Sequence, residues 1–140
     1  MVLSTSIFEK ALSDLVKKPR DGYSNCLNDI IGILCSLSFV EICNLDDVVT
    51  RMQDVVIRKV RIPNSEKSWG KSQGYRLILL CNITEEKIFL LFVYPKKGRL
   101  ESSDLTSKGA ELLIDEFIKI NKSGEIFVPI CKEAETEISE

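Results

Sequence analysis

The sequence predicts a small α+β domain, in which N-terminal helices and a C-terminal helix pack on a small antiparallel sheet. Three features predict it: apolar residues at helical spacing near the start, alternating polarity from residue 55, and another amphipathic segment after residue 103. The 140 residues, 44% hydrophobic and 29% charged, suit one domain with a single core. We expect residues 1–124 to form this domain and residues 125–140 to form an arm and an acidic tail.

Two helices are predicted at the N-terminal end. The first has apolar residues at helical spacing and ends before Pro19 and Gly22: Ile7, Ala11, Leu12, Leu15 and Val16. The second begins near Ser24 or Asn25 and has a similar stripe: Leu27, Ile30, Ile31, Leu34 and Leu37. Residues 39–54 are ambiguous, and four apolar positions there suit a short helix capped by Asn44: Leu45, Val48, Val49 and Met52.

Three strands are predicted in the middle of the chain. Over residues 55–62 the side chains alternate between two faces, with one set being Arg58, Val60 and Ile62 and the other Ile57, Lys59 and Arg61. A polar loop follows at residues 63–74. Residues 75–83 and 87–95 are two strongly apolar strands, and residues 84–86 form the tight turn between them.

A basic loop at residues 96–99 precedes the predicted C-terminal helix. The N-cap of this helix is Ser103, Asp104 or Thr106, because each offers a side-chain oxygen to the first turn. Its buried stripe follows helical spacing: Leu105, Ala110, Leu113, Ile114 and Phe117. Gly124 ends the helical region, and residues 126–131 form either a last strand or a docked arm.

The five cysteines and the lack of histidine exclude several kinds of site. Neither a Cys–His nucleophile, a Ser–His–Asp triad nor a histidine metal site is possible, and the tetracysteine zinc spacing is absent. An odd number of cysteines without a Cys-x-x-Cys pair indicates reduced thiols, most of them in the core. No apolar run reaches the roughly 18 residues of a membrane span. We therefore expect a cytoplasmic protein with no metal, no cofactor and no membrane partner.

Charge is distributed unevenly along the chain. Residues 1–50 carry a net charge of −3, residues 51–100 of +7 and residues 101–140 of −6. Two interpretations of the basic centre remain open. Its lysines and arginines either coat exposed strands or form a face that binds the phosphate groups of a nucleic acid.

Residues 69–76 read WGKSQGYR, and the Gly-Lys-Ser in this stretch resembles the end of a phosphate-binding P-loop. That loop needs a glycine five residues before Gly70, where this chain has Ser65. It also needs a helix afterwards, whereas strand formers begin here at Tyr75. The P-loop interpretation is therefore rejected.

An ordered set of segments carries a different resemblance. RKVRIP at residues 58–63 is followed by a glycine-containing polar loop, GYRLI at 74–78, an apolar hairpin and YPKK at 94–97. This set resembles the RelE/ParE superfamily of bacterial toxins, and it is most like the HigB branch. FEKAL at residues 8–12 also resembles the first helix of these toxins. The likeness is best over residues 55–118.

The resemblance implies a sheet packed on N-terminal helices, as in small microbial RNases, and the toxin of a type II toxin–antitoxin pair. RelE- and HigB-type members enter the ribosomal A site and help a ribose 2′-OH of the mRNA attack the adjacent phosphate, which inhibits translation. The family's basic site residues fall on Lys59, Arg61, Arg76 and Lys97 of this chain. The implied partners are the ribosome, mRNA and a cognate antitoxin, expected to be a small helix-turn-helix protein.

Fixed cations suit this chemistry because phosphodiester cleavage builds negative charge on the phosphate oxygens. Arg76 is the candidate phosphate clamp, since a guanidinium fork matches phosphate geometry. Lys59 is the candidate base or electrostatic aid, and Arg61 and Lys97 are candidate charge stabilisers. Further residues near this set are RNA-binding candidates: Lys67, Lys71, Lys96, Arg99 and Trp69.

Alternatives remain open for Trp69 and for the function as a whole. The indole either stacks on an unpaired base or folds back over the domain's own apolar edge, as lone loop tryptophans more often do. The alternative functions are a ParE-like toxin that inhibits DNA gyrase without nuclease activity and a RelE-fold interaction module with a decayed site.

Overall fold

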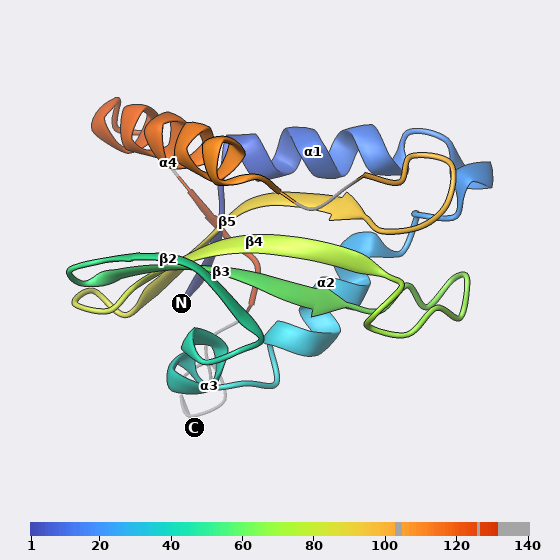
Figure 1. Cartoon of the computed structure of the whole chain (residues 1–140), viewed down its shortest axis with the longest axis horizontal. Helices are drawn as coiled ribbons and strands as arrows, with labels where there is room; N and C mark the ends of the chain where they lie inside the picture. Colours follow the sequence, from blue (N-terminus) through green and yellow to red (C-terminus); the bar gives the residue numbers. More distant parts are fainter. Residues whose placement is uncertain (103–104, 126, 132–140) are drawn as a thin grey trace, which may run out of the picture.

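The computed structural model describes residues 1–102, 105–125 and 127–131. Within them, one mixed sheet is covered by helices on both faces (Figure 1). Its strands, in spatial order, are β2 (Asp47–Met52), β3 (Val55–Ile62), β4 (Tyr75–Asn82), β5 (Lys87–Pro95), β1 (Val2–Ser4) and β6 (Val128–Pro129). The helices are α1 (Ser6–Val16), the 3-10 turn η1 (Pro19–Asp21), α2 (Cys26–Leu34), α3 (Phe39–Cys43) and α4 (Ser107–Lys122). The predicted α+β class is confirmed.

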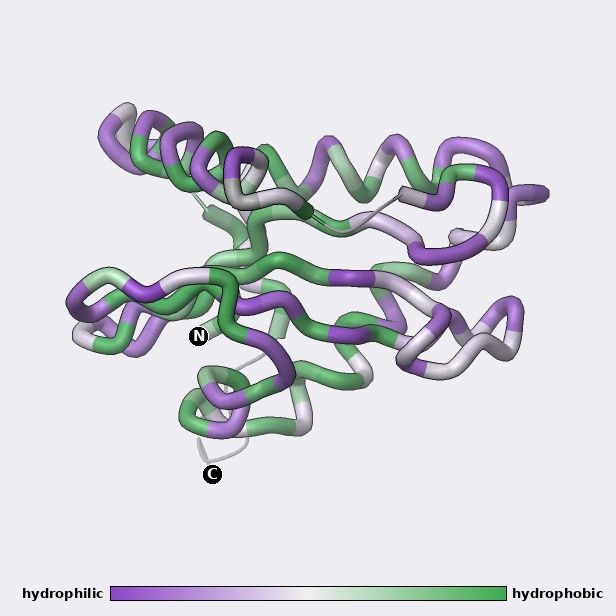
Figure 2. Tube along the Cα trace, in the orientation of Figure 1, coloured by the Kyte–Doolittle hydropathy of each residue, from purple (hydrophilic) through white to green (hydrophobic). Residues whose placement is uncertain are grey.

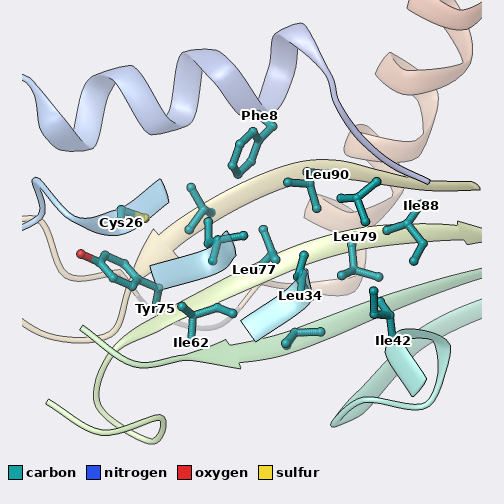
Figure 3. Close-up of a cluster of buried hydrophobic side chains, with 14 of the residues drawn as sticks. Phe8, Cys26, Leu34, Ile42, Ile62, Tyr75, Leu77, Leu79, Ile88 and Leu90 are labelled. Atoms are coloured by element: carbon teal, nitrogen blue, oxygen red, sulfur yellow. The ribbon is translucent and has the colours of Figure 1, made fainter. Parts of the chain in front are cut away.

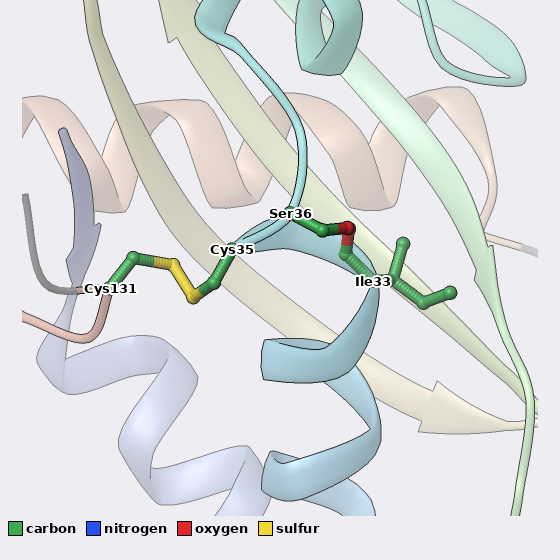
Figure 4. Close-up of a disulfide and its surroundings, with 4 residues drawn as sticks. All are labelled: Ile33, Cys35, Ser36 and Cys131. Atoms are coloured by element: carbon green, nitrogen blue, oxygen red, sulfur yellow. A yellow bond between two sulfur atoms is a disulfide. The ribbon is translucent and has the colours of Figure 1, made fainter. Parts of the chain in front are cut away.

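The central strands form an antiparallel meander of β3, β4 and β5, as the alternating pattern predicts. Hydrophobic residues are concentrated on these strands (Figure 2). β4 is apolar on both faces, so each face needs a cover that excludes water. Helices supply that cover, with α2 in front of the strands and α4 behind them in Figure 4.

The core on the first face is built by α1, α2 and α3. Phe8 of α1 and Leu34 of α2 belong to the same buried cluster as the sheet residues Leu77 and Leu79 (Figure 3). On the opposite face, three residues of the predicted stripe, Leu113, Ile114 and Phe117 of α4, pack over Ile57, Ile78 and neighbouring residues, and Leu105 joins them from just before the helix. Phe117 of α4 lies with its ring centroid 4.9 Å from that of Phe89 on β5. The α4 stripe and the two-faced alternation of β3 are thus confirmed.

The sheet is not purely antiparallel, which corrects the prediction. β1 pairs parallel with β5, with Val2 opposite Ile88 and Ser4 opposite Leu90. β6 then adds antiparallel to the outer side of β1. Three residues are too few to show a period of two, and their pairing depends on contacts with a strand more than eighty residues away along the chain.

The short helix predicted over residues 45–52 is wrong. These residues include β2, which pairs with β3, while the helix lies earlier, at α3. Ser38 and Glu41 form a capping box at the start of α3, and Asn44, the predicted N-cap, lies at its C-terminal end. The buried guanidinium of Arg58 donates to the carbonyls of Cys43, Leu45 and Asp46 and holds this corner.

The N-cap of the C-terminal helix α4 is Thr106, one of the three predicted caps. The Thr106 hydroxyl accepts a hydrogen bond from the Gly109 N–H at 3.0 Å. Ser103 and Asp104, the other candidates, lie outside the described residues, as do Ile126 and residues 132–140 of the acidic tail.

After α4, the Glu125 carboxylate accepts hydrogen bonds from the backbone N–H and hydroxyl of Ser6. This bond and the β6–β1 pairing dock the described part of the arm on the N-terminus.

A disulfide corrects the expectation that all five thiols are reduced. Cys35, at the end of α2, is bonded to Cys131 with a Cα–Cα distance of 5.4 Å (Figure 4). The partners are 96 residues apart, so no local spacing indicates the pair. The other three cysteines are free and buried, and burial raises the pKa of the Cys26 thiol to about 12.

Across the described residues, no helix has both the length and the hydrophobicity for a membrane span.

Replacing Cys131 by serine is expected to lower the free energy of unfolding of the oxidised protein by about 2–5 kcal/mol, because the bond closes a long loop in the unfolded chain. Urea denaturation measures the loss. Under reducing conditions the variant and the natural chain should unfold at nearly the same urea concentration, which is the control. Five titratable thiols in the natural chain, denatured without reductant, would contradict the pairing.

Candidate nucleic-acid interface

Three of the predicted catalytic residues share one face of the sheet. Arg61 of β3 lies directly opposite Arg76 of β4, and Lys59 lies opposite Ile78. Ile57 and Ile78 belong to the core under α4, so the alternation of each strand directs Lys59, Arg61 and Arg76 to that same face. The register therefore brings these three cations together at one end of the sheet.

Arg76 is held by its own loop. It is only 8% exposed, and its guanidinium donates to the carbonyls of Lys71 and Ser72 at 3.0 Å and of Tyr75 at 3.2 Å. These bonds fix the end of the polar loop where it enters β4. A phosphate at this position would have to replace the carbonyls as acceptor.

Arg61 and Lys59 lie beside the acidic start of β2. The backbone N–H of Arg61 donates to Asp46 at 2.8 Å, and its guanidinium lies 3.9 Å from the Asp47 carboxylate. Lys59 is half-buried and is the cross-strand neighbour of Asp47. The Arg61 side chain is 48% exposed, so water screens its ion pair.

Lys97, the fourth predicted catalytic residue, lies against Trp69. Its ammonium is 5.0 Å from the centroid of the indole, and the ammonium of Lys67 is 6.0 Å from the same centroid. We name Lys67, Trp69 and Lys97 the tryptophan cluster. The half-buried Trp69 ring is thus packed against two lysines of its own domain.

The loop that carries Trp69 is braced by buried polar groups. Asn64 pairs with Trp69 through two backbone hydrogen bonds, and its side-chain amide donates to the Gly22 carbonyl. Two exposed hydrogen bonds add to the brace: Asp29 of α2 accepts from the Ser65 N–H, and Glu66 of the loop accepts from the Ser24 N–H. The predicted polar loop is therefore an ordered part of the fold.

The close approach of β3 explains why residue 74, in the WGKSQGYR stretch, is a glycine. A Cβ at this position would lie 2.1 Å from the Ile62 carbonyl oxygen, so only glycine lets β4 begin this close to the end of β3. The Gly74 carbonyl also accepts from the Lys96 N–H, which ties the loop to the end of β5. The Lys71 side chain is exposed. The hydrogen bonds from Arg76 to the Lys71 carbonyl and from Lys96 to the Gly74 carbonyl bring these three predicted residues close to the end of the polar loop.

Arg99 has an internal partner. Its guanidinium lies 3.4 Å from the carboxylate of Asp21, whose side chain is only 4% exposed. The neighbouring Tyr23 is fully buried; its hydroxyl donates to the Lys97 carbonyl and accepts from the Leu100 N–H. Burial, more than any other cause, raises the pKa of this tyrosine. Asp21 and Tyr23 carry no signal in the sequence, because neither belongs to a motif and their partners lie some 75 residues away along the chain.

Two hollows among the described residues have linings that include none of the predicted site residues. One of about 460 Å³ lies between α1, α4 and β5, and another of about 420 Å³ lies beside the turn that joins β4 to β5. Over the described ranges, no group of three Cys, Asp or Glu side chains is placed to hold a metal ion. The candidate interface is therefore a set of cations along the end of the sheet.

Comparison with known proteins gives no family for this chain. No protein-family model matches it, and no curated protein sequence matches it significantly.

Replacing Arg76 by alanine is expected to lower the free energy of unfolding by about 1–3 kcal/mol, because the partly buried carbonyls of the loop lose their donor. Arg61→Ala, on the neighbouring strand, is the matched control. Its ion pair is exposed, so its loss is expected to cost at most about 1 kcal/mol. Urea denaturation of both variants measures the difference, and equal losses would contradict a structural role for Arg76.

Proposed function

We propose that this chain is the toxin of a type II toxin–antitoxin pair and acts as a ribosome-dependent mRNA endoribonuclease. One observation carries the proposal. Arg61 and Arg76 are directly opposite each other on neighbouring strands, and Lys59 lies on the same face. The resemblance to RelE- and HigB-type toxins implies four cations on one face, and these are three of the four; the other, Lys97, lies against Trp69.

The proposed reaction is an attack of the ribose 2′-oxygen on the adjacent phosphorus. The 2′-oxygen loses its proton, the bond from phosphorus to the 5′-oxygen breaks, and the leaving 5′-oxygen gains a proton. Lys59 is the candidate base or electrostatic aid for the first step. Arg61 stabilises the charge that builds on the phosphate oxygens, because a cation fixed near them favours the transition state.

Arg76 has the most demanding part in this mechanism. To clamp the phosphate, its guanidinium would exchange at least one loop carbonyl for a phosphate oxygen. A phosphate offers bidentate bonds between two opposite charges, which are stronger than a bond to a neutral carbonyl, and this gain has to exceed the cost of leaving the carbonyl without its donor. The proposed partners are the ribosome with its mRNA in the cytoplasm and, in the resting state, a small helix-turn-helix antitoxin.

A second candidate function is supported by the same arginine. The low exposure of Arg76 and its three carbonyl partners favour a structural role over a catalytic one. A ParE-like toxin that inhibits DNA gyrase, or an interaction module with a decayed site, would need no free guanidinium at this position.

Expression of the chain without a partner is expected to arrest growth and translation, with cleavage of mRNA on ribosomes. Lys59→Gln and Arg76→Ala should each slow cleavage about a hundred- to thousand-fold, as when a transition-state cation is removed. Ribosome-bound mRNA fragments are measured by primer extension. Lys10→Gln, which removes a lysine from the exposed side of α1, is the control and should leave cleavage unchanged.

Lys59→Gln is included because Arg76→Ala also loosens the loop. Arrest with gyrase–DNA breaks and intact mRNA would favour the ParE-like function. Normal growth at high levels of folded natural chain would favour the decayed module.

A further inference from the structure

We infer that the tryptophan cluster is a phosphate subsite for single-stranded RNA, in which the indole holds two ammonium groups in place. This inference rests on the proposed function and deepens it. In this inference Lys97 binds RNA and does not act in catalysis, and Trp69 positions the two lysines and does not stack on a base.

The contacts of the Trp69 ring favour a role in holding the two lysine side chains in place. Both lysine ammoniums lie within the distance of about 6 Å at which a cation is attracted to an aromatic face. The 96–99 segment also lies beside the indole, since a Cβ at Gly98 would be in ordinary van der Waals contact with Trp69 Cη2, at 3.5 Å. A base that stacks on a face under either ammonium would have to displace that lysine. The indole is therefore better suited to fixing cations than to receiving a base.

Buried groups hold the backbone of both lysines. The Lys67 N–H donates to the side-chain oxygen of Asn64, which is 1% exposed. The Lys97 carbonyl accepts from the hydroxyl of Tyr23, which is fully buried. The aliphatic part of the Lys67 side chain also lies against Gly22, since a Cβ at residue 22 would be only 2.1 Å from the Cε of Lys67. Both lysines thus begin from fixed positions, which lowers the entropy cost of binding a ligand.

Electrostatics favour an anion at this cluster. Two ammoniums near one ring concentrate positive charge there, and a phosphate bound beside them would be attracted to both. Both lysine residues are exposed, so an incoming strand can reach them. Arg99 is not included, because its guanidinium is paired with the buried carboxylate of Asp21.

The loop connects this subsite to the sheet face. Trp69 and Lys67 lie near its middle, while the carbonyls of Lys71 and Ser72 at its far end bind Arg76. A strand of RNA that follows the loop would meet the two lysines first and the sheet cations next. The phosphodiester backbone is the part of RNA that every sequence offers, so we expect the subsite to add affinity without base preference.

Binding to a short single-stranded RNA and to inorganic tripolyphosphate, each measured over a range of salt concentrations, tests the inference. Replacing Lys67 and Lys97 together by glutamine should lower the salt slope for RNA by about 0.7, the value for one lost phosphate contact. The matched control replaces Lys10 and Lys119, two exposed lysines of α1 and α4, and should leave the slope unchanged. Trp69 is the only tryptophan, so its fluorescence reports on the cluster directly. RNA and tripolyphosphate should change its emission similarly, and only while both lysines are present.

Two results would overturn the inference. One is an unchanged salt slope in the Lys67/Lys97 double variant. The other is strong quenching of Trp69 by RNA that tripolyphosphate does not produce and that survives loss of both lysines, as base stacking predicts. If mRNA cleavage persists in either case, the proposed function stands without the subsite. Lysine-dependent binding of tripolyphosphate without mRNA cleavage would support the subsite and contradict the nuclease.

Discussion

β4 is buried on both of its faces, and this constraint organises the molecule. From Tyr75 to Cys81 no side chain is more than 8% exposed. A strand of this kind needs a neighbour on each edge and a helical layer on each face. β3 and β5 supply the edges, α1 to α3 cover one face, and α4 returns to cover the other. The candidate interface lies where this buried strand begins, at the end that the polar loop enters.

Much of the basic charge in the middle of the chain has a structural use. Arg58 and Arg76 are both buried, and each binds several backbone carbonyls at a corner of the fold. A guanidinium suits such corners because its planar fork donates in several directions at once. Arg99 is paired with a buried carboxylate. The clustering of basic residues therefore reflects two causes, corner building and an exposed cationic surface. Arg76 could serve nucleic-acid binding as well as corner building only by exchanging a loop carbonyl for a phosphate oxygen.

The ends of the described chain are joined by several independent contacts. Glu125 binds the first turn of α1, β6 pairs with β1, and Cys131 is bonded to Cys35. β6 has only two residues, one of them Pro129, which lacks a backbone donor. So short a strand adds little stability by itself, and the disulfide and the carboxylate contacts hold the arm in place. The parallel β1 is thus enclosed between β5 and the arm.

The sequence alone determined the features that depend on local pattern. Alternation in β3 assigned Lys59 and Arg61 to the face opposite Arg58, and the apolar runs of β4 and β5 indicated the hairpin. The roles of the arginines, the parallel β1, the Cys35–Cys131 bond and the place of Lys97 beside Trp69 were decided by tertiary structure alone. Each of these joins segments far apart in the sequence. Short-range periodicity reports which side of an element is buried, and it contains no information on which distant group completes a hydrogen bond, a ring contact or a disulfide.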